Sequence, residues 1–173
     1  MCRMIRNTLF FLSILLVFAT GCENIDREEV MQEVPSTSLI DENISGLKLG
    51  MVITHDTFIE EHGEFYDHPH NDTEQPYNLL WNGNILIRVA KETNEIITIF
   101  PEEKNRESAT AKGVKIGTSI ESVVELYGSD YYTYQDRGQG LNEIGYVDHV
   151  NNIRLAFVHF DGKVTNISLS KGY

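Results

Sequence analysis

An internal repeat constrains the fold of this chain more than any other feature of its sequence. Three blocks of the first half recur in the same order in the second half, at an offset of 67 or 68 residues. The matched blocks are 46–50 (GLKLG) with 113–117 (GVKIG), 84–89 (NILIRV) with 152–157 (NIRLAF), and 95–99 (EIITI) with 163–167 (KVTNI). Because matches in one order at a near-constant offset are not expected by chance, we predict two copies of one unit, at 44–110 and 111–173.

The second copy contains the signal of a short amphipathic helix. Residues 118–121 read TSIE, the S/T-x-x-E form of a capping box. Apolar side chains follow at the spacing of one helical face, at Ile120, Val123, Val124 and Tyr127. Gly128 stands where a left-handed residue ends many helices, so the predicted helix is 119–127.

The first copy has a weaker form of the same helix signal. Thr54 is the candidate N-cap, and Phe58 and Ile59 are expected to face inward. Gly63 is expected to end this helix. His62 then stands one residue before the end, where we expect a partly buried or capping histidine.

Each helix is followed by segments with the alternating pattern of half-buried strands. In the second copy the apolar positions are Ile153, Leu155 and Phe157 and, after a turn at Asp161-Gly162, Thr165, Ile167 and Leu169. In the first copy they are Ile85, Ile87 and Val89 and, after a turn at Thr93-Asn94, Ile97 and Ile99. Residues 79–81 and 144–147 are each expected to add an earlier strand. The predicted fold class is α+β, with two tandem helix-plus-antiparallel-sheet repeats packed into one compact domain.

The entry to each helix resembles a known family. The residues that carry the resemblance are Gly113, Ile116, Gly117, Thr118, Ser119 and Gly128 and, in the first copy, Gly46, Leu49, Gly50, Met51 and Gly63. They are similar to the glycine-flanked strand-to-helix entry and the terminal glycine in the tandem repeats of beta-lactamase-inhibitor-protein-like domains, and in the single-repeat small outer-membrane lipoproteins. The family's helix often ends Leu-Gly-x-Pro, and both prolines are absent here. The resemblance implies a binding or scaffolding module and transfers no catalytic residue.

The N-terminus has the anatomy of a bacterial lipoprotein signal. Two arginines precede an apolar run at 9–19. This run fits the apolar region of a signal peptide, about 7–15 residues long, and is too short for a spanning helix of about 20 residues. Small residues at 19–21 then lead into Cys22, which resembles the lipobox cleavage site, with Ala19 where leucine is usual. We predict a signal peptide at 1–21 and a lipid on Cys22. An ordinary signal peptide and a transmembrane anchor are the alternatives.

Residues 22–43 are predicted to form an acidic tether. The stretch from Glu23 to Glu42 contains seven acids, one base and a Pro-Ser-Thr-Ser segment. Self-repulsion of like charges favours an extended, solvated spacer. A short helix over 27–34 is compatible with this stretch. The protein is therefore expected to be lipid-anchored on the extracytoplasmic face of the cell membrane.

The charge of the whole chain excludes some partners. It has 26 acidic and 14 basic residues, for a net charge of −12. Nucleic-acid binding is not expected, because phosphate contacts need clusters of Lys and Arg. An acidic surface favours a basic patch on a protein partner. Cys2 and Cys22 are the two cysteines, and both lie near the N-terminus, so a disulfide scaffold is excluded.

The sequence contains no recognisable catalytic motif. A P-loop and the G-x-G-x-x-G, G-x-S-x-G and H-E-x-x-H patterns are absent. We therefore predict a non-enzymatic module that binds an unidentified envelope or secreted protein, as an inhibitor or an envelope scaffold. The alternatives are an envelope-acting hydrolase or metal-binding lipoprotein that uses loop His and Asp residues, and a purely structural lipoprotein.

Aromatic side chains gather in or beside the connections that follow the predicted helices, at 64–78 and 129–143. Aromatic side chains bury a large area at little entropic cost, which suits them to recognition surfaces. The candidate partner-binding residues are Tyr66, Tyr77, Trp81, Tyr131, Tyr132 and Tyr134. The alternative is that they cover the sheet edge as ordinary half-buried aromatics.

One loop contains a possible metal site. Residues 66–72 read YDHPHND, and in an extended segment His68 and His70 point the same way. Asp67 or Asp72 could add an oxygen ligand, and zinc favours such a set, typically with four ligands. The second copy has no matching histidine, and no other cofactor is expected.

The mature protein is predicted to begin at a lipidated Cys22. Mass spectrometry of the membrane fraction should detect an acylated N-terminal peptide that starts there. Cys22→Ala should release the protein from the membrane, because the acyl chains are the anchor. Unchanged membrane retention of this variant would contradict the prediction.

Overall fold

A computed structural model describes residues 26–136, 138 and 140–172. The predicted signal peptide and Cys22 lie outside the described residues. Within the described part, the elements in chain order are α1 (Arg27–Glu33), α2 (Asp56–His62), β1 (Tyr66–Asp67), β2 (Tyr77–Trp81), β3 (Ile85–Ala90), β4 (Ile96–Pro101), α3 (Ile120–Tyr127), β5 (Tyr132–Asp136), β6 (Leu141–Asp148), β7 (Ile153–Phe160) and β8 (Lys163–Lys171). The α+β class predicted from the sequence is confirmed.

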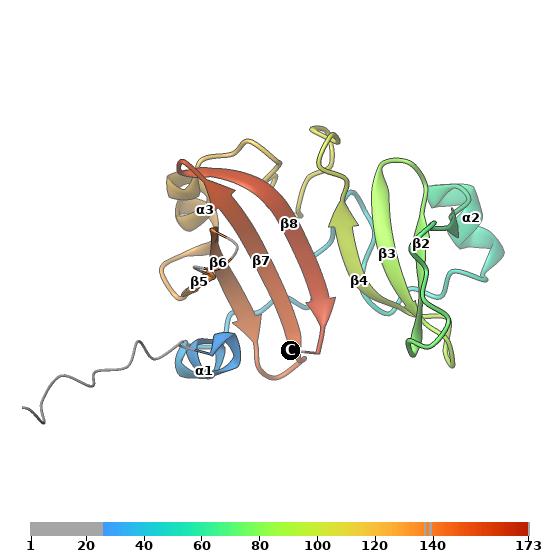
Figure 1. Cartoon of the computed structure of the whole chain (residues 1–173), viewed down its shortest axis with the longest axis horizontal. Coiled ribbons are helices and arrows are strands. Elements are labelled where there is room, and N and C mark those ends of the chain that lie inside the picture. The colour runs from blue at the N-terminus through green and yellow to red at the C-terminus, as the bar shows by residue number, and fades with distance from the viewer. Residues whose placement is uncertain (1–25, 137, 139, 173) are drawn as a thin grey trace, which may run out of the picture.

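All eight strands belong to one antiparallel sheet. The strand order is β1-β2-β3-β4-β8-β7-β6-β5, so each half of the chain contributes four neighbouring strands. The two sets meet where β4 pairs with β8, through Thr98 opposite Ser170 and Ile99 opposite Leu169. Figure 1 shows α3 beside the β5–β8 half and α2 beside the β1–β4 half.

One hydrophobic core extends across both halves. On one face of the sheet, a row of directly paired residues crosses six strands without interruption. The row consists of Leu80, Ile87, Ile99, Leu169, Leu155 and Tyr146, all buried. Phe58 of α2 and Tyr127 of α3 belong to the same buried cluster. The helices therefore cover a single core, and burial in it raises the pKa of Tyr146 to about 12.

The predicted helix of the second half is confirmed, with its cap moved by one residue. Ser119 is the N-cap of α3, and its side chain accepts a hydrogen bond from the backbone N–H of Ser122. Thr118 instead accepts a bond from the backbone N–H of Lys115, in the preceding turn. Gly128 ends the helix with a φ of 96°, a conformation that favours glycine.

The helix of the first half differs from its prediction at two positions. The N-cap of α2 is His55 and makes no side-chain capping bond, so the prediction of Thr54 is wrong. Phe58 is buried, but Ile59 is 45% exposed and does not face the core. Gly63 follows the last helical residue, as predicted.

The strand hairpins follow the predicted turns but contain bulges. The turn at Asp161-Gly162 is confirmed, with positive φ at both residues. In the β3–β4 pair, Arg88 is opposite Thr98 but Val89 is opposite Ile96, so Ile97 is an extra residue. A bulge shifts the inward-outward phase of a strand, so Ile96 and Ile99 are buried where alternation predicted Ile97 and Ile99.

The same shift occurs in the second half. The partners of β7 move between Val158 and His159, which makes Thr165 the extra residue of β8. Val164 is therefore buried, and the inward position predicted for Thr165 is wrong.

The predicted connections 64–78 and 129–143 contain strands that the sequence did not indicate. β1 pairs with β2, and β5 pairs with β6 over five residue pairs. The predicted earlier strands at 79–81 and 144–147 are confirmed as parts of β2 and β6. Residues 132–134 are consequently part of the sheet and do not form a loop.

The N-terminal tether is packed onto the domain. Met31 of α1 is 1% exposed, and Leu39 is 3% exposed. The buried Asp148 accepts hydrogen bonds from the backbone N–H groups of Leu39 and Asn151. Burial alone would raise the pKa of Asp148, but these hydrogen bonds outweigh it and hold that pKa below its usual value. The prediction of a solvated spacer is therefore wrong for residues 26–43, since apolar contacts outweigh their self-repulsion.

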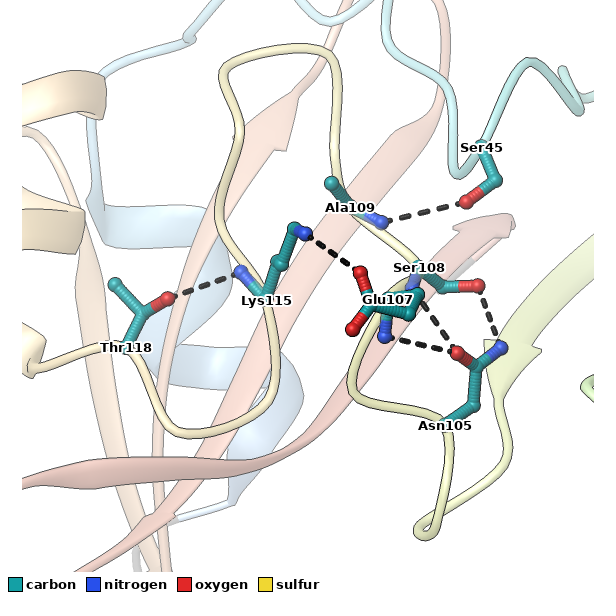
Figure 2. A network of polar contacts seen from close by, with 7 residues as sticks. All are labelled: Ser45, Asn105, Glu107, Ser108, Ala109, Lys115 and Thr118. Atoms are coloured by element: carbon teal, nitrogen blue, oxygen red, sulfur yellow. Dashed lines mark hydrogen bonds and ion pairs between the residues drawn. The ribbon is translucent and has the colours of Figure 1, made fainter.

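A network of polar contacts organises the linker between β4 and α3. Figure 2 shows Asn105, whose side chain accepts from the backbone N–H groups of Glu107 and Ser108 and donates to the Ser108 hydroxyl. Ser45 contributes its hydroxyl, which accepts from the backbone N–H of Ala109. The network thus joins the linker to the segment that precedes α2.

The buried Glu42 ties the same region to α3. Its carboxylate accepts hydrogen bonds from the Tyr127 hydroxyl at 2.7 Å and from the backbone N–H of Ala111 at 2.6 Å. Removing one partner from such a buried charged group leaves it unsatisfied, at a cost of about 1–3 kcal/mol. Glu42 is therefore part of the structural framework.

The fragment 44–110 is predicted not to fold alone. It contains α2 and β1–β4, but it loses β8, so the apolar side chain of Ile99 loses its partner Leu169. Units of this size are marginal even when their cores are complete. Circular dichroism of the fragment should show no cooperative thermal transition, whereas the intact chain should show a single one. A sharp transition in the isolated fragment would contradict the prediction.

Candidate functional site

The face of the sheet opposite α2 and α3 is the candidate binding surface. A row of directly paired residues also crosses this face. It consists of Leu79, Arg88, Thr98, Ser170, Arg154 and Val147. A neighbouring row contains Trp81, Leu86 and Phe100 in one half and Ser168, Ala156, Gly145 and Tyr132 in the other. The side chains at the centre of this face are therefore mostly small, such as Thr98, Ser170 and Ser168. Aromatic side chains lie toward its two ends.

Helix α1 covers the β5–β6 end of this face. Met31 packs in a buried cluster with Tyr132 and Val147. The Arg27 guanidinium lies 4.4 Å from the centre of the Tyr134 ring, and its Nε is 3.6 Å from Glu143 Oε1. A helix of seven residues is too short to be stable by itself, so these contacts hold it.

Glu143 is the buried charge beneath α1. It is 5% exposed, accepts a hydrogen bond of 2.6 Å from the Tyr132 hydroxyl, and lies 3.9 Å from Nη1 of Arg154. Burial and the neighbouring Glu143 carboxylate raise the pKa of Tyr132. A Cβ added at Gly145 would lie 2.5 Å from the Tyr132 ring, so the glycine provides the space for that ring. Tyr132 is thus a structural residue of the covered end.

The β2–β4 end of the face is uncovered by any described helix. We call this end the open half-face. It consists of Tyr77, Leu79, Trp81, Leu86, Arg88 and Phe100, all half-buried. A partly exposed surface of aromatic and aliphatic groups of this kind is typical of an interaction site.

Arg88 stands at the centre of the open half-face. Its guanidinium lies 4.9 Å from the ring centre of Tyr77 and 5.4 Å from that of Phe100. It is the only charged residue in β2, β3 and β4. Among the described residues it has no ion pair, and its Nε is buried without a hydrogen-bond partner.

The structure divides the six predicted partner-binding residues among four places. Tyr77 and Trp81 lie on the open half-face, and Tyr66 is opposite Trp81 at the sheet edge, 61% exposed. A hydrogen bond from Tyr66 to Glu64 raises the Tyr66 pKa.

The remaining three candidates do not form a free surface in this structure. Tyr131 packs against the core and contacts Tyr146 on the helix side of the sheet. Tyr132 and Tyr134 lie under α1. Their burial fits the alternative of ordinary half-buried aromatics that cover the sheet, and a partner-binding role for these three residues stays a prediction.

Sequence reasoning overlooked Arg88, Leu79, Leu86 and Phe100. A charge within three otherwise uncharged strands was a usable signal for Arg88. The other three alternate with core residues, so the sequence did not show that their face of the sheet is open.

The histidine pair lies beside the open half-face. The backbone N–H of His68 donates to the carbonyl of Leu79, and the His68 ring meets the Trp81 ring edge-on at 5.8 Å. His68 Nδ1 accepts a hydrogen bond from the backbone N–H of His70. Within the described ranges, no group of three or more His, Cys, Asp or Glu residues is arranged to hold a metal. Zinc binding by His68 and His70 therefore stays a prediction.

A shallow polar hollow of about 470 Å³ lies between α2 and the β2–β3 hairpin. It is lined by polar groups, among them Asn82, Asn105 and Glu107, and by the apolar side chains of Leu47 and Ile85. The His62 side chain is 14% exposed, as expected for a partly buried histidine, and its Nε2 is 3.8 Å from Glu61. Asn105 is already committed to the linker network, which gives this hollow a structural role.

Comparison with known proteins does not assign a family to the chain. No family model, curated protein or solved structure gives a match. In the part of the chain that the structure describes, none of the helices has the length and apolar character needed to cross a bilayer. The open half-face is therefore the main structural guide to function.

Met31→Asp is predicted to detach α1 without unfolding the domain. The substitution would bury an unpaired carboxylate between Tyr132 and Val147, which is unfavourable. Hydrogen exchange should increase at least about tenfold over residues 28–34, while β7 and β8 stay protected. Glu29→Gln, on the exposed side of the same helix, is the matched control and should leave exchange unchanged. Continued protection of α1 in Met31→Asp would show that this contact does not hold it.

Proposed function

We propose that this protein is a membrane-anchored extracytoplasmic lipoprotein that acts as a non-enzymatic protein-binding module. The observation that carries the proposal is the open half-face. It presents aromatic and aliphatic side chains from three adjacent strands on a continuous sheet. A regular sheet places such side chains on a rigid platform, so little conformational entropy is lost when a partner binds.

The buried acids of the domain support a structural rather than a catalytic use. Glu42 is held by a tyrosine hydroxyl and backbone N–H groups, and Glu143 by Tyr132 with two nearby arginines. Both carboxylates stabilise packing between elements, which is what a binding scaffold needs.

We also infer that the two halves are copies of one ancestral unit. Each half has the order helix followed by four strands, and each last hairpin has a bulge, with Ile97 and Thr165 as the extra residues. These features agree with the sequence repeat and with the resemblance to the beta-lactamase-inhibitor-protein-like repeats. Such a duplication would give each copy a sheet face, one covered by α1 and one free for a partner.

The position of α1 would keep the domain close to the membrane. Five residues lead from Cys22 to Arg27, and an extended chain spans at most about 3.3–3.6 Å per residue. A lipid on Cys22 would therefore hold a docked α1 within about 20 Å of the bilayer surface. A partner would be bound next to the membrane.

Capture of a binding partner should depend on Tyr77 and Trp81. The test is crosslinking of the anchored protein in its own cells, followed by pull-down, with the double variant Tyr77→Ala, Trp81→Ala. We expect loss of the specific partner because the variant removes two aromatic rings of the open half-face. Phe160→Ala, which removes a 72% exposed aromatic at the β7–β8 turn, is the matched control and should retain capture.

Equal capture by both variants, with the fold intact by circular dichroism, would exclude the open half-face as the binding surface. If capture were lost only when residues 131–134 were substituted, the binding site would instead be at the β5–β6 end of the face, which α1 covers.

A further inference from the structure

We propose that the open half-face binds a carboxylate side chain of a protein partner, and that Arg88 recognises it. This inference rests on the proposed function, because it names the chemistry of the partner that the same surface would bind. It also differs from the expectation drawn from net charge, under which an acidic protein should select a basic partner. The setting of Arg88 is the reason for the difference.

Two aromatic rings hold the Arg88 guanidinium. The ring centres of Tyr77 and Phe100 lie 4.9 and 5.4 Å from its Cζ atom, distances at which cation–π attraction operates. A stacked guanidinium keeps its N–H groups in its own plane, so they remain available at its edge. That edge matches the two oxygens of a carboxylate, which can accept two parallel hydrogen bonds.

Arg88 lacks the anionic partner that the other arginine of the row has. Arg154, three strands away in the same row, lies 3.9 Å from Glu143, which α1 then covers. The Nε of both arginines is buried without a hydrogen-bond partner, but Arg88 has neither a carboxylate nor a covering helix within the described chain. An incoming carboxylate would give Arg88 the pairing that Glu143 gives Arg154.

A bulge lies beside Arg88. The register of β3 and β4 changes between Arg88 and Val89. Bulges bend a strand and redirect the side chains next to them. Arg88 remains paired with Leu79 on one side and Thr98 on the other, so its position across the sheet is well defined.

The surroundings of Arg88 favour a protein carboxylate over a phosphate. Phosphate-recognition sites and anionic membranes generally engage clusters of Arg and Lys, whereas β2, β3 and β4 supply a single guanidinium. Leu79, Trp81 and Leu86 surround it with apolar area, the composition of a protein-interface hot spot. The expected partner segment therefore has an Asp or Glu flanked by apolar side chains.

The test uses selection from a displayed library of random twelve-residue peptides, with the full chain immobilised in detergent micelles as the target. Parallel selections use Trp81→Ala and Arg88→Met, and the latter keeps an apolar stem in place of the arginine. Peptides that bind the unmodified protein but not Trp81→Ala should be enriched in Asp or Glu next to apolar residues. Arg88→Met should not enrich those acidic peptides.

The best peptide is then compared with its amide twin, in which the acid becomes Gln or Asn. Calorimetry should give a Kd about ten- to a hundredfold weaker for the twin, the range expected for a hydrogen bond between charged groups. Arg88→Met should cause a similar loss with the acidic peptide and no further loss with the twin. Arg88→Lys keeps the charge without the planar fork and should be intermediate. Lys163→Met, which removes an exposed cation elsewhere, should not change the Kd.

The outcomes separate this inference from the proposed function. Two results would overturn the role of Arg88 and leave the binding surface in place. One is a set of selected peptides whose binding requires Trp81 but which contain no Asp or Glu. The other is a set of acidic peptides that bind a correctly folded Arg88→Met variant as tightly as the unmodified protein. Failure to select any Trp81-dependent peptide overturns the surface itself. Binding to phosphatidylglycerol vesicles that is lost in Arg88→Met would assign Arg88 to lipid phosphate and overturn the inference.

Discussion

The pairing of β4 with β8 is the contact on which the rest of the structure depends. It joins two four-stranded sets into one sheet and carries the core row from Ile99 to Leu169. It also aligns the opposite face, where Thr98 meets Ser170. Without this pairing, β4 and β8 would each expose an unpaired edge, and the buried row on the helix-covered face would be interrupted between Ile99 and Leu169.

The acidic N-terminal segment belongs to this fold, although its charge is typical of a free tether. Fully burying a side chain such as Met31 contributes about 1.5–3 kcal/mol. The ion pair of Arg27 with Glu143 contributes less, because desolvation of the buried carboxylate offsets much of the Coulomb attraction. Packing of Met31 is therefore the main contribution to the docking of α1 on β5 and β6. Because α1 covers the β5–β6 end of this face, only the open half-face is available to a partner.

Net charge is a poor guide to the chemistry of that available end. The chain has a net charge of −12, yet β2, β3 and β4 contain Arg88 as their single charged residue. Binding responds to the charges that are desolvated at the contact, because charges at a distance are screened within about one Debye length. Arg88 lies beside the rings of Tyr77 and Phe100 and would be desolvated by any partner that covers this surface. Acidic residues elsewhere on the protein would affect mainly the rate at which a charged partner approaches, through long-range steering.

Local patterns in the sequence were sufficient to predict the α+β class, the helix ending at Tyr127, the Asp161-Gly162 turn and most of the apolar positions in the strands. These features depend on residues close in sequence, through caps, turn conformations and side-chain alternation. The tertiary structure alone decided the exposure of Ile97 and Thr165, because a bulge changes the phase of alternation. It likewise decided the burial of Met31 and Tyr132 and the isolation of Arg88, because each of these is set by strands and helices that are distant in the chain and meet only when the sheet forms.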